Sequence, residues 1–397
     1  MNSSYSDDRD PDNSGLDGID VEDKASARRK PQKRRSHQDV ARKSYSSEVT
    51  DVSIWQASPY SKYLKGSYVQ TRNLKLFVEM GGDPKDPVIL LISGLGAQML
   101  MWPSGFCEHL IKQGFRVIRF DNRDIGLSEK IEPSSELEAG SGPPIPTPWQ
   151  RVRMMSRFKL GLSNNRSSAA YSLFDMAHDV RDLMDALEIP KAHVIGCSMG
   201  GMIAQIFAAS FPSRVQRLGL LSTSYNQPLS KPPLPRQMIA LMRAPASTEQ
   251  PELVEHTFNV LKQISAIKYF DEETIRQKAK QTIERSFYPQ GVGRQLLAIF
   301  ATGSLTVTTR SIKARTLVVH GSEDKVFSLQ HGRALSKAIP RAKFVKIDDM
   351  GHQIPLALEG YLARLFSNFC QNLPVNLHLH ETITHDPIEL GHLSSTP

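Results

Sequence analysis

The sequence predicts an α/β fold in which a mostly parallel central sheet carries helices on both faces and a helical cap covers one edge. Short apolar runs, as expected for strands buried on both faces, alternate along the chain with amphipathic helical segments. One long helical stretch, residues 226–311, interrupts that alternation. The composition, with 40% hydrophobic and 23% charged residues, is ordinary for a globular protein and allows a sizeable core.

The first part of the alternation lies between residues 68 and 221. Residues 68–72 and 74–78 alternate polar and apolar side chains, which predicts an antiparallel pair of strands. Val88–Ile92 is a continuous apolar run, as expected for a strand buried on both faces. By the same criteria we expect further strands at 115–120, 193–196 and 215–221, and helices at 106–113, 171–187 and 202–211.

Two stretches interrupt this pattern, and the alternation resumes after the second. Residues 131–170 are rich in Pro, Gly and Ser and then basic, which predicts an insertion loop. Residues 226–311 open with prolines and continue with helical segments at 253–267 and 273–286, then a glycine-containing segment at 291–303. This stretch is long enough to form a helical cap over the sheet edge. After it we expect strands at 316–320 and 343–347 and helices at 330–339 and 356–372.

The predicted core therefore spans residues 61–225 and 312–374, and residues 375–397 follow it as a C-terminal tail. Residues 1–60 are predicted to be a disordered charged tail, because apolar residues are sparse and an acidic block precedes a basic one. A segment of this composition cannot bury enough apolar surface to offset the entropy that it would lose on ordering.

The formal net charge of +8 says little about the folded part, because much of it comes from basic residues in the N-terminal tail. Basic runs are weak patterns, and we favour a solvated tail over a localisation signal or an anion-binding arm. We expect no nucleic-acid-binding surface on the folded domain. A nucleic-acid-associated protein would have to act through residues 24–43.

Cysteine usage and hydropathy indicate the compartment. The three cysteines, Cys107, Cys197 and Cys370, lack the spacing of a disulfide framework or a metal site, so we expect reduced thiols. The first residues lack the apolar segment of a secretory signal. No stretch approaches the roughly 18 consecutive apolar residues of a membrane span. These observations favour a cytoplasmic protein without a membrane span and leave the oligomeric state open.

The strongest functional signal is a G-x-S-x-G motif at a predicted strand-to-helix junction, Gly196-Cys197-Ser198-Met199-Gly200. In this context the serine sits on a tight turn, the nucleophile elbow, which lifts its hydroxyl above the sheet. The glycines leave room for neighbouring backbone, and the following helix directs its positive N-terminus at developing negative charge. We predict Ser198 as the nucleophile; the alternative is a glycine-rich turn with an idle serine.

A serine nucleophile needs a base, and the base needs a carboxylate that orients it. Both follow downstream, in the order Ser, acid, His that accompanies this motif. Asp324 closes the segment His320-Gly-Ser-Glu-Asp after a predicted strand, and this spacing favours it over the adjacent Glu323. His352 follows the last predicted strand. Because both lie at carboxyl ends of parallel strands, we predict Asp324 as the acid and His352 as the base.

An oxyanion hole for this chemistry uses two backbone N–H groups. One is predicted to be that of Met199, directly after the nucleophile. For the second we predict Leu95, which follows Val88–Ile92 and lies between Gly94 and Gly96, so that backbone can approach a substrate oxygen. The alternative is that these glycines only form a turn.

Together these motifs resemble the α/β-hydrolase fold superfamily over roughly residues 66–374, and within it the branch of aclacinomycin methylesterase-like carboxylesterases. The segments that carry the resemblance are residues 93–96, 101–103, 120–128, 196–201, 293–298, 320–324 and 351–352. The resemblance implies ester hydrolysis without a metal or an organic cofactor. It assigns the triad roles to Ser198, Asp324 and His352. One departure is Ser93, which stands where the wider family commonly has His.

We therefore expect a serine hydrolase that cleaves a carboxylic ester of a small apolar or amphipathic molecule through an acyl-enzyme intermediate. A C–C bond hydrolase would share the triad, but such enzymes commonly have Trp after the base, where this chain has Gln353. A cofactor-free haloperoxidase and a non-catalytic binding protein on this scaffold are further alternatives. Five apolar residues are candidates for a pocket wall, with ordinary core packing as the alternative: Met154, Met155, Phe158, Phe300 and Leu305.

Overall fold

A computed structural model of the chain describes residues 55–131, 169–227 and 249–375, together with isolated residues between 149 and 163 and residues 237 and 245. All of them belong to one unit of the chain, Ser47–Pro397. Several sequence predictions fall outside the described residues: the tail up to residue 54 with its basic segment 24–43, most of the 131–170 insertion with Met154, Met155 and Phe158, the first part of the cap, and the C-terminal tail beyond residue 375.

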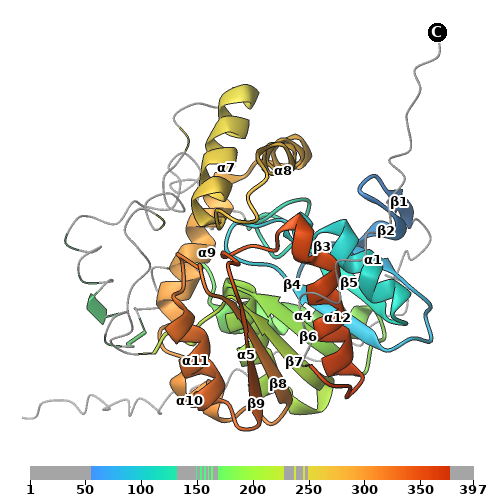
Figure 1. Cartoon of the computed structure of the whole chain (residues 1–397), viewed down its shortest axis with the longest axis vertical. Helices are drawn as coiled ribbons and strands as arrows, with labels where there is room; N and C mark the ends of the chain where they lie inside the picture. Colours follow the sequence, from blue (N-terminus) through green and yellow to red (C-terminus); the bar gives the residue numbers. More distant parts are fainter. Residues whose placement is uncertain are drawn as a thin grey trace, which may run out of the picture. The chain divides into compact units, whose positions relative to one another are not determined.

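The described strands form a single sheet in the order β1-β2-β3-β5-β4-β6-β7-β8-β9 (Figure 1). Neighbours are antiparallel from β1 to β5 in that order and parallel from β5 to β9, which confirms the predicted mostly parallel sheet. The strands are β1 (Gln56–Ser58), β2 (Ser61–Gln70), β3 (Lys75–Gly81), β4 (Val88–Ile92), β5 (Arg116–Phe120), β6 (Ala192–Cys197), β7 (Val215–Leu221), β8 (Arg315–Gly321) and β9 (Ala342–Ile347).

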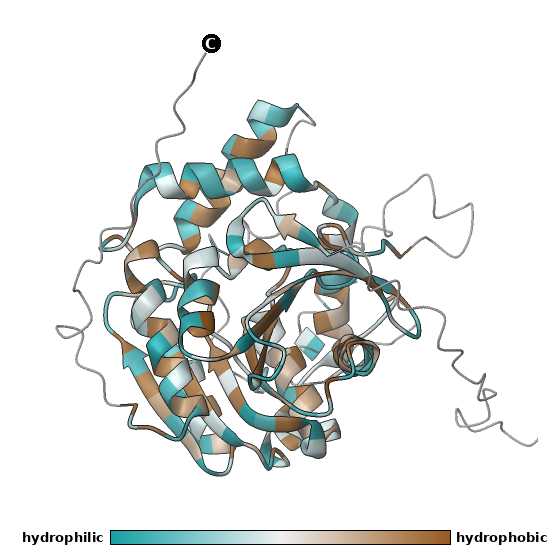
Figure 2. Ribbon diagram, turned by 90° about the vertical axis from the view of Figure 1, so that its right-hand side faces the viewer, coloured by the Kyte–Doolittle hydropathy of each residue, from teal (hydrophilic) through white to brown (hydrophobic). Residues whose placement is uncertain are grey.

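Helices cover both faces of the sheet, as predicted. Alternate residues of a single strand enter the two cores, as Ile89 and Leu90 of β4 do, and Figure 2 shows the hydrophobic strands in the interior. Among the described residues, no helix has the length and apolar character to cross a bilayer. The helices are α1 (Ser104–Lys112) and α12 (Glu359–Cys370) on one face, and α4 (Leu173–Ala186), α5 (Met199–Ser210) and α11 (Leu329–Ala338) on the other.

Three helices of the segment between β7 and β8 lie beyond the carboxyl ends of the parallel strands (Figure 1): α7 (Gln250–Ile264), α8 (Glu272–Arg285) and α9 (Pro289–Thr302). We call these three helices the cap. The sequence marks only a glycine-containing segment at 291–303, whereas the structure forms a helix there. Gly291 is required because a Cβ atom would lie 2.1 Å from the Asp124 carbonyl oxygen.

The last part of residues 226–311 packs on the core. In the short helix α10 (Thr306–Arg310), the Thr309 hydroxyl donates to Oε1 of Gln205 in α5 at 2.8 Å. Just before it, the Leu305 N–H donates to the Tyr225 carbonyl, and its side chain lies in the core beside α5. The chain therefore returns to the core before residue 312, where the sequence places the boundary.

The antiparallel edge begins earlier than the sequence predicts. β1 lies within residues 1–60, which the sequence assigns to the tail, and it pairs with β2, which starts at Ser61. Backbone pairing holds β1, because two of its three residues are exposed and contribute little to a core. A strand of this kind has almost no apolar pattern by which sequence analysis could find it.

A buried ion pair joins this edge to the first parallel strands. Arg119 of β5 is 0% exposed and lies opposite Glu79 of β3, which is 1% exposed. The guanidinium donates two hydrogen bonds to Glu79 Oε2, at 2.6 and 2.9 Å, and a third to the Trp102 carbonyl. The pair thus fixes the strand that leads into residues 121–131, which carry the contacts to the cap.

We expect the Glu79→Ala variant to lose about 3–5 kcal/mol in free energy of unfolding, because it leaves the Arg119 charge buried without a partner. Urea denaturation measures this change. The matched control is Asp185→Ala, since Asp185 pairs with Arg214 but is half exposed. That variant should lose less than about 1 kcal/mol. Equal losses in the two variants would contradict the expectation.

Candidate active site

Ser198 lies at the junction of β6 and α5 with φ 55° and ψ −124°, a backbone conformation that is costly for a residue with a side chain. Close backbone packing holds it there. A Cβ atom on Gly196 would lie 2.3 Å from the Gly200 carbonyl oxygen, and one on Gly200 would lie 2.2 Å from that of Ile92. The Thr223 hydroxyl also donates to the Ser198 carbonyl at 2.6 Å. The G-x-S-x-G spacing is therefore a steric requirement of this turn.

The structure brings the three predicted triad side chains together. His352 Nε2 lies 3.0 Å from Ser198 Oγ, and His352 Nδ1 lies 2.8 Å from Asp324 Oδ2. The other carboxylate oxygen, Oδ1, accepts from the N–H groups of Val326 and Phe327. With Nδ1 donating to the carboxylate, Nε2 is free to accept the serine proton. Glu323, the neighbouring alternative to Asp324, is exposed.

Asp324 is held as a carboxylate despite its burial. Burial alone would raise its pKa, but the adjacent His352, with its hydrogen bond, together with His320 and the N–H of Phe327, lowers the pKa below its ordinary value. The Nε2 of His320 lies 3.4 Å from Asp324 Oδ2 and 2.8 Å from the Phe327 carbonyl. The sequence analysis singles out no role for His320, whereas the structure places its buried ring against Asp324, where burial lowers its own pKa.

The segment 93–96 after β4 lies directly against the elbow. A Cβ atom on Gly94 would be 3.2 Å from the Ser198 Cβ. Among the described residues, no protein acceptor takes a hydrogen bond from the N–H of Leu95 or of Met199. Met199 is the first residue of α5, where an N–H group has no partner within the helix. Both N–H groups that the sequence singles out thus remain available to a substrate oxygen beside Ser198.

Cys197 immediately precedes the serine, but its environment is unsuited to a nucleophile. Its side chain is buried in the core on the face of α1 and α12. Burial, together with the charge of Asp324, raises the thiol pKa, so the thiolate is strongly disfavoured. Of these two neighbouring side chains, the hydroxyl of Ser198 is therefore the candidate nucleophile.

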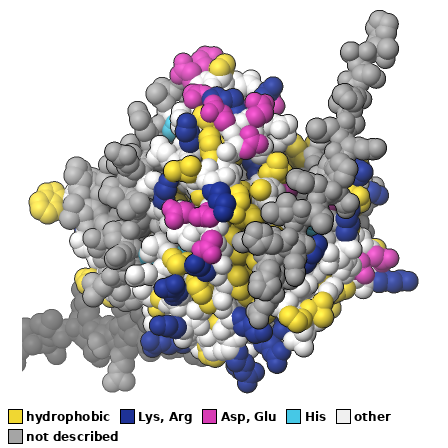
Figure 3. Space-filling view, viewed as in Figure 1, with side chains coloured by type: hydrophobic (Ala, Val, Ile, Leu, Met, Phe, Trp, Pro, Cys, Tyr) yellow, Lys and Arg dark blue, Asp and Glu magenta, His cyan; other side chains and the backbone are white. Residues whose placement is uncertain are grey.

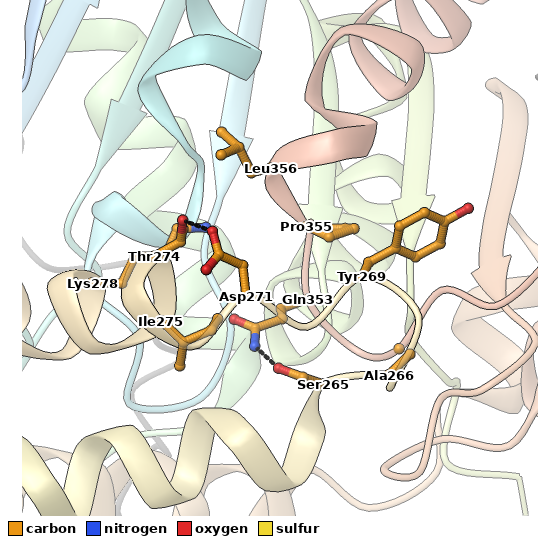
Figure 4. Close-up of a pocket in the computed structure, with 11 residues that line it drawn as sticks. Ser265, Ala266, Tyr269, Asp271, Thr274, Ile275, Lys278, Gln353, Pro355 and Leu356 are labelled. Atoms are coloured by element: carbon orange, nitrogen blue, oxygen red, sulfur yellow. Dashed lines mark hydrogen bonds between the residues drawn. The ribbon is translucent and has the colours of Figure 1, made fainter. Parts of the chain in front are cut away.

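The end of α7 contacts the loop that carries His352. The His352 N–H donates to the Ile264 carbonyl at 3.0 Å, and Gln353 Nε2 donates to the Leu261 carbonyl and to the Ser265 hydroxyl. Figure 4 shows Gln353 and Ser265 at a pocket between α7, α8 and this loop, which Lys278 also lines. Phe300 and Leu305 do not line this pocket; Leu305 lies in the core.

Several residues at the site have no assigned role in the sequence prediction. Asn122 donates to the Ser93 carbonyl at 3.0 Å, and Gln295 of α9 accepts from the Gly96 N–H at 2.9 Å. Both lie in segments that carry the family resemblance, which is the one signal that could have singled them out. In the described ranges, no group of three or more His, Cys, Asp or Glu side chains could hold a metal ion.

Comparison with known proteins identifies the proteins to which this chain is similar. Residues 87–356 match the model of a family described as alpha/beta hydrolase fold. Rhodomycin D methylesterase DnrP of Streptomyces peucetius is 25% identical over 309 residues, which cover 72% of this chain and 92% of that protein. The 2-hydroxy-6-oxo-6-phenylhexa-2,4-dienoate hydrolase of Comamonas testosteroni is 28% identical over 184 residues, covering 44% of this chain and 61% of that enzyme.

The same fold occurs in solved structures. The enol-lactonase from Burkholderia xenovorans LB400 superposes with a TM-score of 0.57 and 22% identity, covering 77% of this chain and 100% of that one. Similarity at this level supports the fold of the sheet and its helices, and it leaves the chemistry to be argued from the site.

We expect the Gly200→Ala variant to lose about 3 kcal/mol or more in free energy of unfolding, because the added methyl group would clash with the backbone of β4. Thermal and urea unfolding measure the loss. The control is Gly360→Ala in α12, whose methyl group would lie nearest to a side-chain ring, that of His109 at 3.1 Å, rather than to backbone. If the two variants were equally stable, the close packing described for the elbow would be wrong.

Proposed function

Because the chain belongs to the α/β-hydrolase fold family, we propose that it is a serine esterase that hydrolyses a carboxylic ester of a small apolar or amphipathic molecule. Ser198 is the nucleophile, His352 the base and Asp324 the residue that orients His352. The hydrogen-bonded series from Ser198 Oγ through His352 to Asp324 carries this proposal. The two unpaired N–H groups of Leu95 and Met199 beside the serine support it further.

In the first half of the reaction, Ser198 Oγ attacks the ester carbonyl carbon while His352 Nε2 takes the hydroxyl proton. The carbonyl oxygen becomes an oxyanion, and the N–H groups of Leu95 and Met199 donate to it. Collapse of this intermediate breaks the bond to the alcohol, which leaves with the proton from His352. The product is an acyl-serine. Asp324 stabilises the imidazolium throughout and stays ionised.

In the second half, a water molecule attacks the acyl carbon as His352 takes its proton. The same two N–H groups hold the second oxyanion. Collapse breaks the bond to Ser198, His352 returns the proton to the serine oxygen, and the carboxylic acid leaves. The cycle needs no group beyond the side chains and backbone described above.

The surroundings of the serine favour an uncharged ester. Apolar side chains lie next to the reacting groups: Val292 packs on Gly96, and the Phe327 ring lies 5.9 Å from that of His352. On the face shown in Figure 3, the outer surface of α7 and α8 carries both signs of charge, as in the pairs that Arg276 forms with Glu255 and Glu272. Charges of mixed sign give little steering of an ionic substrate. The similarity to a methylesterase also favours an ester.

Cleavage of a C–C bond is the second candidate, because several relatives are hydrolases of that type. Gln353 argues against it. Gln353 stands directly after the base, at the position where C–C bond hydrolases commonly carry Trp. Its side chain is hydrogen-bonded to the end of α7. A haloperoxidase shares the triad, and a binding protein would retain only the scaffold. An assay of ester and C–C substrates side by side separates the esterase from the C–C bond hydrolase.

We expect the wild-type protein to react with a fluorophosphonate probe and to hydrolyse short p-nitrophenyl esters, whereas Ser198→Ala does neither, since no other group at the elbow can take over the attack. Mass spectrometry of the labelled peptide and absorbance assays measure this. The matched control is Ser222→Ala at the end of β7, whose buried hydroxyl has no partner among the described residues. Unlabelled wild type would instead favour a binding protein.

We expect Asp324→Asn to lower kcat by about 10⁴-fold, because an amide would hold the wrong tautomer of His352. The control is Glu323→Gln, which removes the exposed neighbouring carboxylate and should keep kcat within about twofold of the wild type, as surface changes usually do. Steady-state kinetics on the same p-nitrophenyl ester distinguishes the two. A large loss of kcat in the Glu323 variant alone would indicate that Glu323, and not Asp324, is the carboxylate that orients His352.

A further inference from the structure

Gln295 of α9 connects two core loops at the candidate active site. Its side chain is fully buried, and both ends of its amide are used. Oε1 accepts from the Gly96 N–H at 2.9 Å, and Nε2 donates to the Arg123 carbonyl at 2.9 Å. The amide thus joins the segment after β4 to the segment after β5 through a residue of the cap.

The contact with Gly96 fixes one end of the segment that carries Leu95. At the other end, the Ser93 carbonyl accepts from the Asn122 side chain at 3.0 Å. Gly96 has φ +64°, so its backbone turns sharply directly after Leu95. The Leu95 N–H lies between these two anchored points. Its direction therefore depends on the hydrogen bonds of Asn122 and Gln295 and on that of the Gly94 N–H, which donates to Met101 Sδ at 3.0 Å.

The helix that carries Gln295 is itself held firmly. Arg294 donates to both carboxylate oxygens of Asp124, at 2.8 and 2.9 Å, and the Tyr171 hydroxyl donates to the same carboxylate. Gly291 lies against the Asp124 carbonyl, and Val292 lies against Gly96. Gln295 consequently has a fixed position relative to the core, and its hydrogen bond to Gly96 can hold the segment 93–96 in place.

We propose that Gln295 is a positioning residue for the oxyanion hole: by holding the Gly96 N–H, it aims the Leu95 N–H at the oxygen of the reacting carbonyl. This inference rests on the proposed function, since it needs an oxyanion to form beside Ser198. Gln295 touches neither the substrate nor the serine. Part of the catalytic geometry therefore depends on the cap, because without α9 the segment after β4 would lose the anchor at Gly96, the residue directly after Leu95.

Gln295→Met tests the proposal, because methionine keeps the length of the side chain but can form neither hydrogen bond. We expect kcat on a p-nitrophenyl ester to fall about 10- to 100-fold, the effect of a misaimed rather than a missing donor. KM should stay within about threefold, since the lost interaction acts in the transition state. A purely structural role of Gln295 would instead raise KM.

A trifluoromethyl ketone provides a second readout. Ser198 Oγ adds to its carbonyl carbon, the hydroxyl proton passes to His352, and the resulting oxyanion takes the place of the reaction's own. The affinity of Gln295→Met for this ketone should fall by the same factor as kcat. An affinity that stays at the wild-type value while kcat falls would overturn the proposal.

The matched control is Gln205→Met in α5, which removes another fully buried glutamine, whose three hydrogen bonds go to Gly201, Ser224 and Thr309 and not to residues 93–96. Its kcat should stay near that of the wild type. If Gln295→Met does not fold, Gln295→Asn carries the same expectation, because the shorter amide cannot reach both Gly96 and Arg123. A kcat of either folded Gln295 variant equal to that of Gln205→Met would overturn the inference.

Failure of the proposed function would look different. A wild-type protein that neither turns over esters nor binds the ketone refutes the esterase proposal before any variant is compared. An active wild type with an equally active Gln295→Met refutes only the role of Gln295.

Discussion

The backbone of Ser198 is the constraint on which the candidate site depends. A non-glycine residue with φ 55° is stable here because β6, α5 and the end of β4 pack closely and hold the backbone of the turn in this conformation. The turn leaves Ser198 half-buried, and α5 starts directly after it at Met199, whose N–H is unpaired among the described residues. The loops after β4, β8 and β9 bring Leu95, Asp324 and His352 to the site around Ser198. Gly196, Gly200 and the end of β4 thus determine the geometry of the turn on which the candidate nucleophile lies.

The sequence predicts those elements whose place in the structure follows from a local pattern of residues. Val88–Ile92 reads as a buried strand because every residue faces one of the two cores, and the structure confirms it. The positions of Ser198, Asp324 and His352 could be predicted because each follows the carboxyl end of a recognisable strand, and the carboxyl ends of parallel strands meet at one edge of the sheet. The structure brings these three side chains within hydrogen-bonding distance, in the order that the motifs suggest.

Other features depend on contacts between distant parts of the chain, which no local pattern records. Gln295 lies 199 positions after Gly96, and in the sequence it is one polar residue of a glycine-containing segment. α9 was missed as a helix because its glycines lower helix propensity, although Gly291 is there to let Asp124 approach. β1 was missed because an edge strand is held by backbone hydrogen bonds, so its side chains carry no burial signal.

The ion pair between Arg294 and Asp124 bears on how the chain unfolds. The cap has only a small apolar cluster of its own, formed by Phe258, Ile275 and Ala279 with a few neighbours, so most of what stabilises α9 belongs to the sheet. Separating α9 from the sheet would expose Arg294 and leave Asp124, buried at its side chain, without its cation. α9 and the parallel strands consequently form one cooperative unit. Amide hydrogens of α9 would exchange with solvent through the same global opening as those of β6, rather than through local fraying.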